Sequence, residues 1–481
     1  MRYRMCGGYL TVYVALTLSV ILSLCLALVE GVRTGAIQMQ AVCVCDIAGD
    51  SILAEYHREL FEQYNVFFVD TSYGTKYTSE VNTKNRLQYY LDKNVDYEQV
   101  RQLDFLYKDF LALSFENLEL NGVHFATDAC GEVFQKSAIE AIKEDCGLAT
   151  IEEILTFVTK ATESGYLNED TEAKRQQTSD EIEAYKAEYF QLQQAPSATI
   201  EIKNPIAYAG SMQAGGVLNM CLEGNEVSAN TIEPAMYISN RKETAEKVRS
   251  GSYLSKGELT VAEKILLREY FLRYAGNYTE EKPESVLKYQ AEYLIAGKSS
   301  DCDNLAATIR RILGIREAAN VAHIYASEEK MAVAKVLGTA LSAALLIPEA
   351  AEVFTVGVVL AWGFMESVHD VKVLTSGGKV PFSKTAQSWH TDIDSIWQGI
   401  DGAASPVTGE TYKDYLRLLL YLADSGELTY RFMDLCEMDI RLTPGNENFR
   451  MDACANYFEV SMDAVSRYGY QYEMSRVICY Q

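Results

Sequence analysis

The sequence has little proline and glycine for its length. Its 481 residues include 8 Pro and 30 Gly, whereas Tyr is abundant at 32. A β sandwich or barrel needs turn residues at short intervals, so this composition disfavours an all-β protein. Hydrophobic residues make up 48% of the chain, which is enough for a sizeable core. We therefore expect a mainly α protein with roughly two to three domains.

Positive charge is also scarce. The chain has 43 Lys and Arg against 67 Asp and Glu, which gives a formal net charge of -24. Such a chain repels the phosphate backbone of nucleic acids. We therefore expect no nucleic-acid partner.

Sequence motifs for catalysis and metal binding are almost absent. There are only five His residues, and the patterns G-x-S-x-G, H-E-x-x-H and C-x-x-C do not occur. Glu366 and His369 form one ExxH pair on a predicted helix, but a carboxylate-bridged di-metal site needs a second such pair. Asp392 and Asp394 lack the surrounding calcium loop. We interpret all four as structural or solvated, and expect no catalytic residue, metal ligand or cofactor.

The segment AGKSS looks like the end of a phosphate-binding loop. That loop requires a glycine five residues before the glycine of the GK pair, Gly297, and the residue there is Glu292. We expect instead that Gly297 ends one helix and that Ser299, Ser300 or Asp301 caps the next.

Residues distant in sequence can still meet in space. The alternative to a non-catalytic function is therefore a membrane-anchored extracytoplasmic enzyme or a ligand-binding ectodomain.

One long apolar run lies near the N-terminus. Tyr9 to Val29 contains no charged residue, and at a rise of roughly 1.5 Å per residue a helix of this length spans about 31 Å, one bilayer crossing. Arg2 and Arg4 precede the run and Glu30 follows it. The positive-inside rule then predicts a single-pass protein of the cell membrane, with residues 1–8 in the cytoplasm and the bulk of the chain outside it.

Other export signals compete with a simple anchor. A cleaved secretory signal would have a shorter apolar region, and a lipoprotein signal would have its Cys after the run, whereas Cys6 precedes it. A prepilin-type cut would fall between Gly8 and Tyr9, but the glutamate that pilins usually carry at the fifth mature position is replaced by Tyr13. We expect either no cleavage or a minor, non-polymerising component.

Small and hydroxylated residues recur along this run at four-residue steps, which places them on one helix face. The face could pack against another transmembrane helix, or its residues could merely make the anchor less apolar without a packing role. Its members are Thr11, Ala15, Ser19 and Ser23.

Beyond the membrane run, the apolar pattern divides the chain into four parts. We expect an amphipathic stalk helix over residues 30–70, a helical region over 71–195, an irregular or short-strand region over 196–252, and a helical domain over 253–481. The last part ends in predicted amphipathic helices that include FRMDACANYFEVSMDAVSRY.

Two apolar stretches in the last part, Val333 to Ile347 and Val353 to Phe364, could be mistaken for a transmembrane hairpin. Each is too short to cross a bilayer, Lys335 interrupts the first, and Pro348 lies between them. We expect a buried helical hairpin over 333–364.

Eleven Cys are present, and nine follow the apolar run. Nine cannot all pair within one chain, and their spacing matches no disulfide framework. We expect most of them to be buried, unpaired thiols.

The N-terminal part of the chain resembles a known group. Residues 7–70, beginning GGYLTVYVALTLSVILSLCLALVEGVR, resemble the start of an uncharacterised Firmicutes membrane-protein family, a domain of unknown function, encoded with tight-adherence (Tad) pilus genes. The order of Gly8, an apolar helix, Glu30 and Arg33 is similar to that in Tad minor pseudopilins. Further blocks resemble the same group: YQAEYLIAGKSSDCDNLAATIRRILGIREAANVAHIY, VVLAWGFMESVHDVKVLTSGGKVPFSKTAQSW, TYKDYLRLLLYL and YRFMDLCEMDIR. The resemblance implies a non-catalytic, pseudopilin-like or scaffold component of a Tad-type pilus or secretion apparatus, with other envelope or pilus-apparatus proteins as partners.

Overall fold

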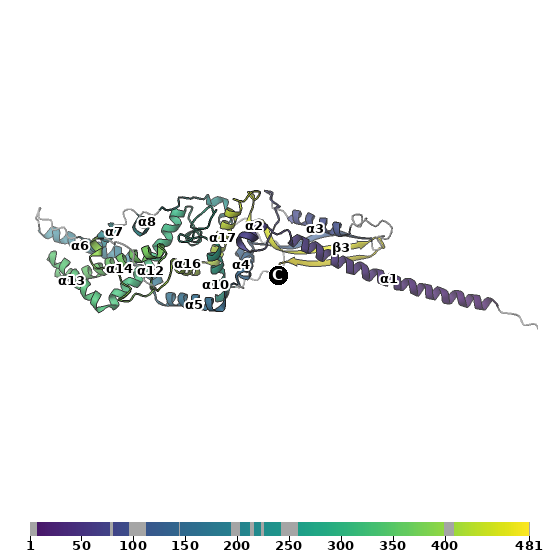
Figure 1. The fold of residues 1–481 in the computed structure, drawn as a ribbon, viewed down its shortest axis with the longest axis horizontal. Helices are drawn as coiled ribbons and strands as arrows, with labels where there is room; N and C mark the ends of the chain where they lie inside the picture. Colours follow the sequence, from purple (N-terminus) through teal and green to yellow (C-terminus); the bar gives the residue numbers. More distant parts are fainter. Residues whose placement is uncertain are drawn as a thin grey trace, which may run out of the picture. The chain divides into compact units, whose positions relative to one another are not determined.

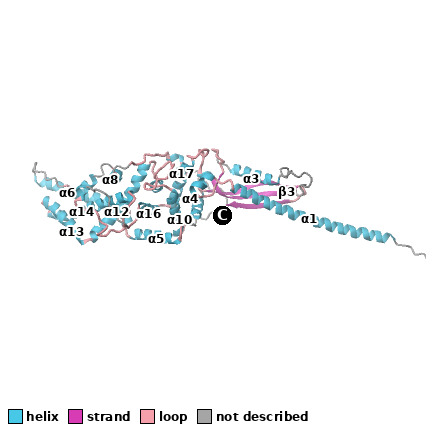
Figure 2. Ribbon diagram, in the orientation of Figure 1, coloured by secondary structure: helices cyan, strands magenta, loops and turns pink. Residues whose placement is uncertain are grey.

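A computed structural model of the chain describes residues 7–76, 80–95, 112–143, 145–193, 203–211, 216–222, 226–241, 258–398 and 408–480. The fold is mainly helical with an apolar N-terminal helix, as predicted, and it also has one small antiparallel sheet (Figures 1 and 2). The chain forms two compact units. The first comprises Met1–Val133 and Thr443–Gln481, and the second comprises Phe134–Lys242 and Gly257–Leu442.

In its described residues, the first unit contains a long helix, three shorter helices and the sheet. Its elements are α1 (Gly7–Leu53), α2 (Arg58–Tyr64), β1 (Val69–Asp70), α3 (Glu80–Val95), β2 (Leu113–Phe125), the short helix η7 (Met451–Ala453), β3 (Cys454–Ser466) and β4 (Gln471–Cys479).

Strand β3 is the centre of the sheet. It pairs antiparallel with β2 along one edge and with β4 along the other, where β1 also pairs with its first residues. The register places Phe115 opposite Ala464 and Met462 opposite Met474. The sheet therefore joins the N-terminal 125 residues to the C-terminus of the chain.

The prediction of a helix over the β3 segment is wrong. Phe458, Val460, Met462 and Ala464 are all buried, and the residues between them are only partly so. This period of two places alternate side chains on one face of a strand. The segment also contains residues that suit a helix, and its partner β2 lies more than 300 residues earlier, so the local pattern alone did not reveal that pairing.

The region 196–252, predicted to be irregular or to form short strands, consists of short helices and irregular segments in its described part. Its described residues form the short helices α7 (Pro205–Ser211), α8 (Val217–Leu222), η4 (Pro234–Met236) and η5 (Ile238–Asn240). In place of short strands, the described part shows one isolated bridge, between Thr231 and Ser300. The named strands of the sheet come from elsewhere in the chain, at residues 69–70, 113–125, 454–466 and 471–479.

Helix α1 ends at Leu53 and does not continue as a stalk to residue 70. After it, Tyr56 forms a bridge with Val69, so the chain turns back and α2 is a separate short helix. The second half of α1 is packed on α3, β3 and β4 rather than exposed. Its inward face consists of Ile37, Ala41, Val44, Cys45, Ala48 and Ile52, all buried.

The core of the first unit explains the helical spacing of these residues. They recur at steps of three or four and so form one apolar stripe. The stripe packs against Leu87 and Leu91 of α3 and against inward side chains of the sheet such as Val460. Gly49 lies on the same side, where a Cβ atom would approach Ile478 to 3.1 Å.

Among the described residues of the second unit, the named elements are all helices. Besides the short helices above, its elements are α4 (Asp128–Lys143, which begins in the first unit's residues), α5 (Leu148–Glu163), η2 (Tyr166–Asn168), α6 (Thr171–Gln193), α10 (Val261–Tyr274), α11 (Gln290–Ala296), α12 (Asp301–Ala326), α13 (Glu328–Ala344), η6 (Pro348–Ala350), α14 (Ala351–Thr375), α15 (Ser395–Gln398), α16 (Tyr412–Leu422) and α17 (Ser425–Ile440).

Helix α14 lies at the centre of this unit and packs against α6, α7, α8, α12 and α13. It is apolar and long enough to cross a membrane, but 78% of its most apolar window is buried within the unit. Helix α13 pairs with it and buries only one face, through Ala334, Gly338 and Ser342, while Val336 on the other face is exposed.

The cysteines are less buried than expected. Four of the nine that follow the apolar run are buried: Cys45, Cys221, Cys436 and Cys454. Three others are exposed and two are half-buried, and the described cysteines form no disulfide with one another. Cys43 illustrates why fewer cysteines are buried than expected. It lies on the outward face of α1, beside the buried apolar stripe but not in it.

Candidate functional site

The AGKSS segment has the capping role predicted for it. Gly297 adopts a left-handed conformation with φ of 63° and ends α11, and the Ser300 side chain accepts a hydrogen bond from the Asp303 backbone N–H at the start of α12. The side chain of Arg431 fills the space above Gly297, where a Cβ atom would lie 2.8 Å from the guanidinium carbon. The segment is a helix–helix connection.

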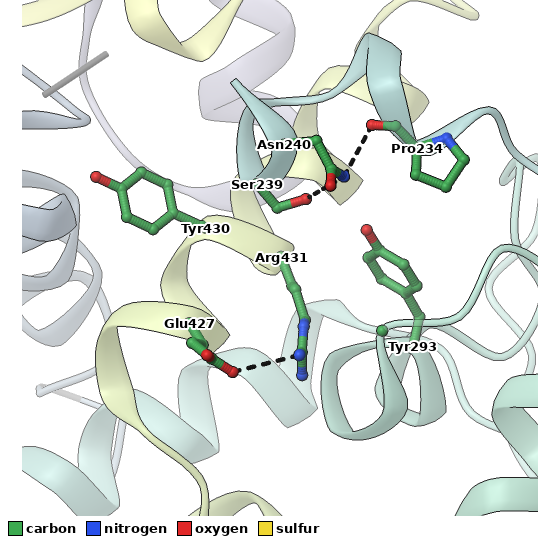
Figure 3. Close-up of a pocket in the computed structure, with 8 residues that line it drawn as sticks. Pro234, Ser239, Asn240, Tyr293, Glu427, Tyr430 and Arg431 are labelled. Carbon is green, nitrogen blue, oxygen red and sulfur yellow. Dashed lines mark hydrogen bonds and ion pairs between the residues drawn. The ribbon is translucent and has the colours of Figure 1, made fainter. Parts of the chain in front are cut away.

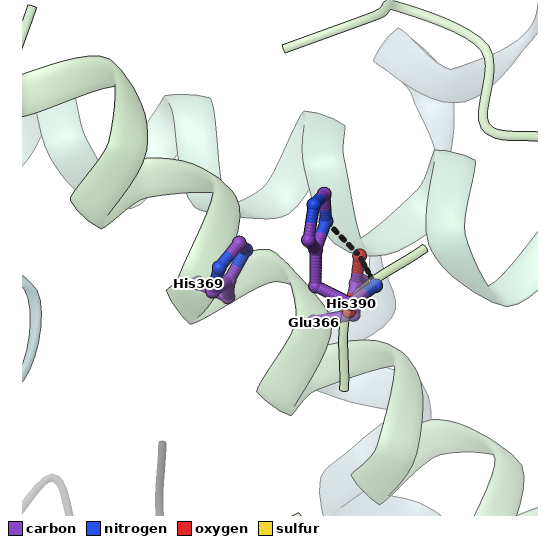
Figure 4. Close-up of side chains that lie close together, drawn as sticks. All are labelled: Glu366, His369 and His390. Carbon is purple, nitrogen blue, oxygen red and sulfur yellow. Dashed lines mark hydrogen bonds and ion pairs between the residues drawn. The ribbon is translucent and has the colours of Figure 1, made fainter. Parts of the chain in front are cut away.

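The ExxH pair on α14 acquires a third member in the fold. Glu366 and His369 project from adjacent turns, and His390 reaches them from the loop that follows (Figure 4). Potential ligand atoms of the three lie within 4.8 Å of one another, and the two imidazole rings are stacked with centroids 4.7 Å apart. The sequence alone does not single out His390, because it lies in an irregular segment with no fixed spacing from the helix.

The Glu366 carboxylate is already fully engaged. The Lys384 ammonium donates to Oε1 at 2.5 Å, and the backbone N–H groups of His390 and Thr391 donate to Oε2 at 3.3 and 2.9 Å. Glu366 and Lys384 are both buried. The carboxylate therefore has a permanent cationic partner inside the protein.

Lys384 also connects Glu366 to a second buried ion pair. Its ammonium donates to Asp370 Oδ1 at 2.6 Å, and the Arg316 guanidinium donates to Asp370 Oδ2 at 2.9 and 3.0 Å. Asn320 donates to the same oxygen at 3.0 Å. Two carboxylates thus face two cations, and we call Arg316, Glu366, Asp370 and Lys384 the buried charge network.

Electrostatics within the network favour the ionised form of Asp370. Burial alone would raise the pKa of Asp370, but Arg316 and Lys384 hold that pKa below its ordinary value. Burial lowers the pKa of His369, so its imidazole is neutral near pH 7. The two acidic and two basic side chains of the network balance in formal charge, so no further ion is needed to neutralise it.

These residues do not fit a metal ion. A structural or catalytic zinc site needs at least three protein ligands, and Glu366 is held by Lys384, whose positive charge would repel a dication. His369 and His390 alone remain, and Nδ1 of His369 has no hydrogen-bond partner among the described residues. The cluster joins α12, α14 and the loop carrying Lys384 and His390.

A second polar feature is a hollow of about 250 Å³. It lies between η5, α11 and α17 and is lined by residues that include Ser239, Tyr293 and Arg431 (Figure 3). The Tyr293 hydroxyl donates to Asp434 at 2.8 Å, and Arg431 donates to the Leu294 carbonyl at 2.7 Å. Its polar groups are thus largely committed to the protein, and its lining residues include no nucleophile paired with a histidine base.

The first half of α1 is the largest exposed apolar surface in the described part of the chain. Tyr9, Leu16, Leu24 and Leu28 are each at least 60% exposed, although all lie on one regular helix. The proposed packing face is exposed on this same surface: Thr11, Ala15, Ser19 and Ser23.

The possible processing site lies at the beginning of α1. Gly8 is in its first turn and Tyr9 follows directly. The helix starts before the proposed cut, at Gly7, so removal of residues 1–8 would leave the apolar run and the packed half of the helix intact.

Comparisons with known proteins give one family and no characterised relative. Residues 196–466 match the family of unknown function DUF5702. This match covers more than half of the chain and includes α14 and the buried charge network. No curated protein and no solved structure matches.

Proposed function

We propose that this chain, which belongs to the DUF5702 family of unknown function, is a membrane-anchored, non-catalytic envelope protein of pilin-like build. The observation that carries the proposal is the division of α1 into two halves. Ile37 to Ile52 form the core of a folded unit, whereas Tyr9 to Val29 of the same helix are exposed. The second half of the helix is therefore part of the folded unit, whereas the first half presents an apolar surface that must be shielded from water.

The lipid bilayer is the environment that best suits this surface. The run contains 21 residues without charge, and leaving so many apolar side chains in water is strongly unfavourable. The helix also continues without a break from the run into the core. A secretory signal that is cut off just after its apolar region would not be built into the core in this way.

The pilin-like part of the proposal rests on the arrangement of helix and sheet. A long helix whose second half packs on a small antiparallel sheet agrees with the resemblance of residues 7–70 to Tad minor pseudopilins. Tyr13, in place of the usual glutamate, favours a minor or uncleaved component over a polymerising subunit. Other envelope or pilus-apparatus proteins would then be the partners.

Topology tests the anchor. In a variant that retains only Cys302, which is exposed, an impermeant maleimide should label intact, wall-stripped cells, because Arg2 and Arg4 keep the N-terminus inside. The chain should stay in the membrane pellet after an alkaline carbonate wash. Labelling only after lysis would reverse the orientation, and release by the wash would refute the anchor.

Processing is tested separately. Mass spectrometry of the purified native protein should find an intact MRYRMCGG at the N-terminus. A mature end at Tyr9 would instead show that a prepilin-type peptidase acts on the chain.

A further inference from the structure

Strand β4 runs along α1 from near the end of the apolar run to Leu53, the last residue of the helix. The Tyr480 hydroxyl donates to the Leu53 carbonyl at 2.6 Å, and Arg476 pairs with Asp46 at 3.5 Å. At the other end of the strand, the Tyr470 hydroxyl donates to a carboxylate of α1, that of Glu30. These three contacts fix the position of the β3–β4 hairpin along the helix (Figure 1).

The tip of this hairpin therefore lies at the end of the apolar run. Besides the Tyr470 contact, the Arg33 guanidinium lies over the Tyr468 ring at 4.3 Å. The apolar run ends at Val29, and at roughly 1.5 Å per residue Arg33 is about 6 Å beyond it. The headgroup layer on each side of a bilayer is roughly 5 to 8 Å thick. If Tyr9 to Val29 cross the bilayer, the tip falls within this layer.

The chemistry of the tip suits a headgroup layer. Arg467, Tyr468 and Gly469 are exposed, in a turn that Gly469 permits with its φ of 88°. Tyrosine is enriched at membrane interfaces because its ring is apolar and its hydroxyl is polar. Arginine binds phosphate oxygens through several N–H groups. The tip is thus cationic and aromatic in a chain whose net charge is -24.

We propose that the tip of the β3–β4 hairpin, residues 467–470, rests in the lipid headgroup layer and holds the first unit against the membrane surface. Arg467 binds lipid phosphate and Tyr468 lies between headgroups and acyl chains. On α1, Arg33 contacts the Tyr468 ring and Glu30 accepts a hydrogen bond from the Tyr470 hydroxyl, and these contacts hold the tip in place. This inference rests on the proposed membrane anchor and adds a second, interfacial contact to it.

Photo-crosslinking to lipid tests the inference. The full-length chain is reconstituted in vesicles of phosphatidylcholine and phosphatidylglycerol that carry radiolabelled lipid. Benzoylphenylalanine replaces one residue at a time: Leu18 in the apolar run, Tyr468 at the tip, or Ser475, which is exposed on β4 and five residues nearer the C-terminus than Tyr470. The aromatic replacement keeps a ring at position 468.

We expect lipid adducts at Leu18 and Tyr468 and several-fold less at Ser475. Arg467→Gln should lower the adduct at Tyr468 by roughly fivefold in these anionic vesicles and leave it unchanged in pure phosphatidylcholine. Adducts at Leu18 with no excess at Tyr468 over Ser475, or a protein adduct in place of lipid, would overturn the inference alone. An absence of lipid adducts at Leu18 would overturn the anchor itself.

Discussion

Gly338 of α13 lies so close to Thr355 of α14 that a Cβ atom on the glycine would be 2.6 Å from both the backbone N and Cα of Thr355. Side-chain carbons do not approach backbone atoms to this distance in folded proteins. The crossing of the two helices therefore depends on the missing side chain, and the obstacle on the α14 side is rigid backbone.

The first prediction follows from this contact. Gly338→Ala should force α13 and α14 apart and lower the free energy of unfolding by about 1 to 3 kcal/mol, measured by urea denaturation followed by tryptophan fluorescence. Gly314→Ala in α12 is the matched control, because a Cβ atom there meets nothing within 4 Å. The control should be neutral or more stable by up to about 1 kcal/mol. Equal effects of the two substitutions would contradict the close crossing.

The second prediction concerns the buried charge network. Lys384→Met leaves Glu366 and Asp370 without their shared cation inside the protein and should lower the free energy of unfolding by roughly 3 to 5 kcal/mol. Lys143→Met is the control: its ion pair with Glu140 is exposed on both sides, and its loss should cost at most about 1 kcal/mol. A small effect at Lys384 would show that the network does not stabilise the second unit.

The third prediction concerns pH. Glu292 is buried, and although it accepts hydrogen bonds from the Tyr278 N–H and the Tyr412 hydroxyl, burial raises the pKa of its carboxyl from 4.5 to about 7. The folded state thus keeps the proton that the unfolded state loses. Stability from this carboxyl is fully present below about pH 4.5, falls between pH 4.5 and 7, and stays reduced above pH 7.

Glu292→Gln removes this titration. A shift from 4.5 to about 7 corresponds to roughly 3 kcal/mol, so the variant should lose that much less stability than the parent between pH 4.5 and 7.5 in urea titrations. Glu140→Gln, at an exposed position, should follow the parent curve. Asp370 does not interfere in this range, because its lowered pKa confines its loss of stability to more acidic pH. Parallel curves for Glu292→Gln and the parent would contradict a raised pKa.

The fourth prediction separates the two faces of α1. Ala41 is fully buried against the core of the first unit, whereas Met39, two residues earlier, is 70% exposed. Ala41→Glu places a carboxylate in that core and should destabilise the first unit by about 3 kcal/mol, seen as rapid proteolysis near α1. Met39→Glu should leave protease resistance unchanged. The same resistance in both variants would mean that α1 is a free stalk after all.

The packing of α1 in the first unit also determines where the chain can be truncated to make a soluble version of the protein. Truncation near Tyr64 would remove Ile37 to Ile52, which form part of the core of the first unit. Deletion of residues 1–29 takes away the exposed apolar run and leaves that core whole.

Several features follow from the sequence alone. An uncharged run from Tyr9 to Val29 can only be a helix if its backbone groups are to be satisfied in an apolar setting. Gly297 and Ser300 specify the end of one helix and the start of the next through their own backbone and side-chain preferences. These are local properties, so local pattern is enough to predict them.

The remaining features required the tertiary structure. The β3 segment becomes a strand because β2, more than 300 residues earlier, supplies an edge for it, and no local periodicity contains that partner. In the same way, Glu366 and His369 were visible on their helix, but Lys384 and His390 reach them through a loop of no regular spacing. Strand pairing and charge pairing depend on distance in space, which the folded chain sets and the order of residues does not.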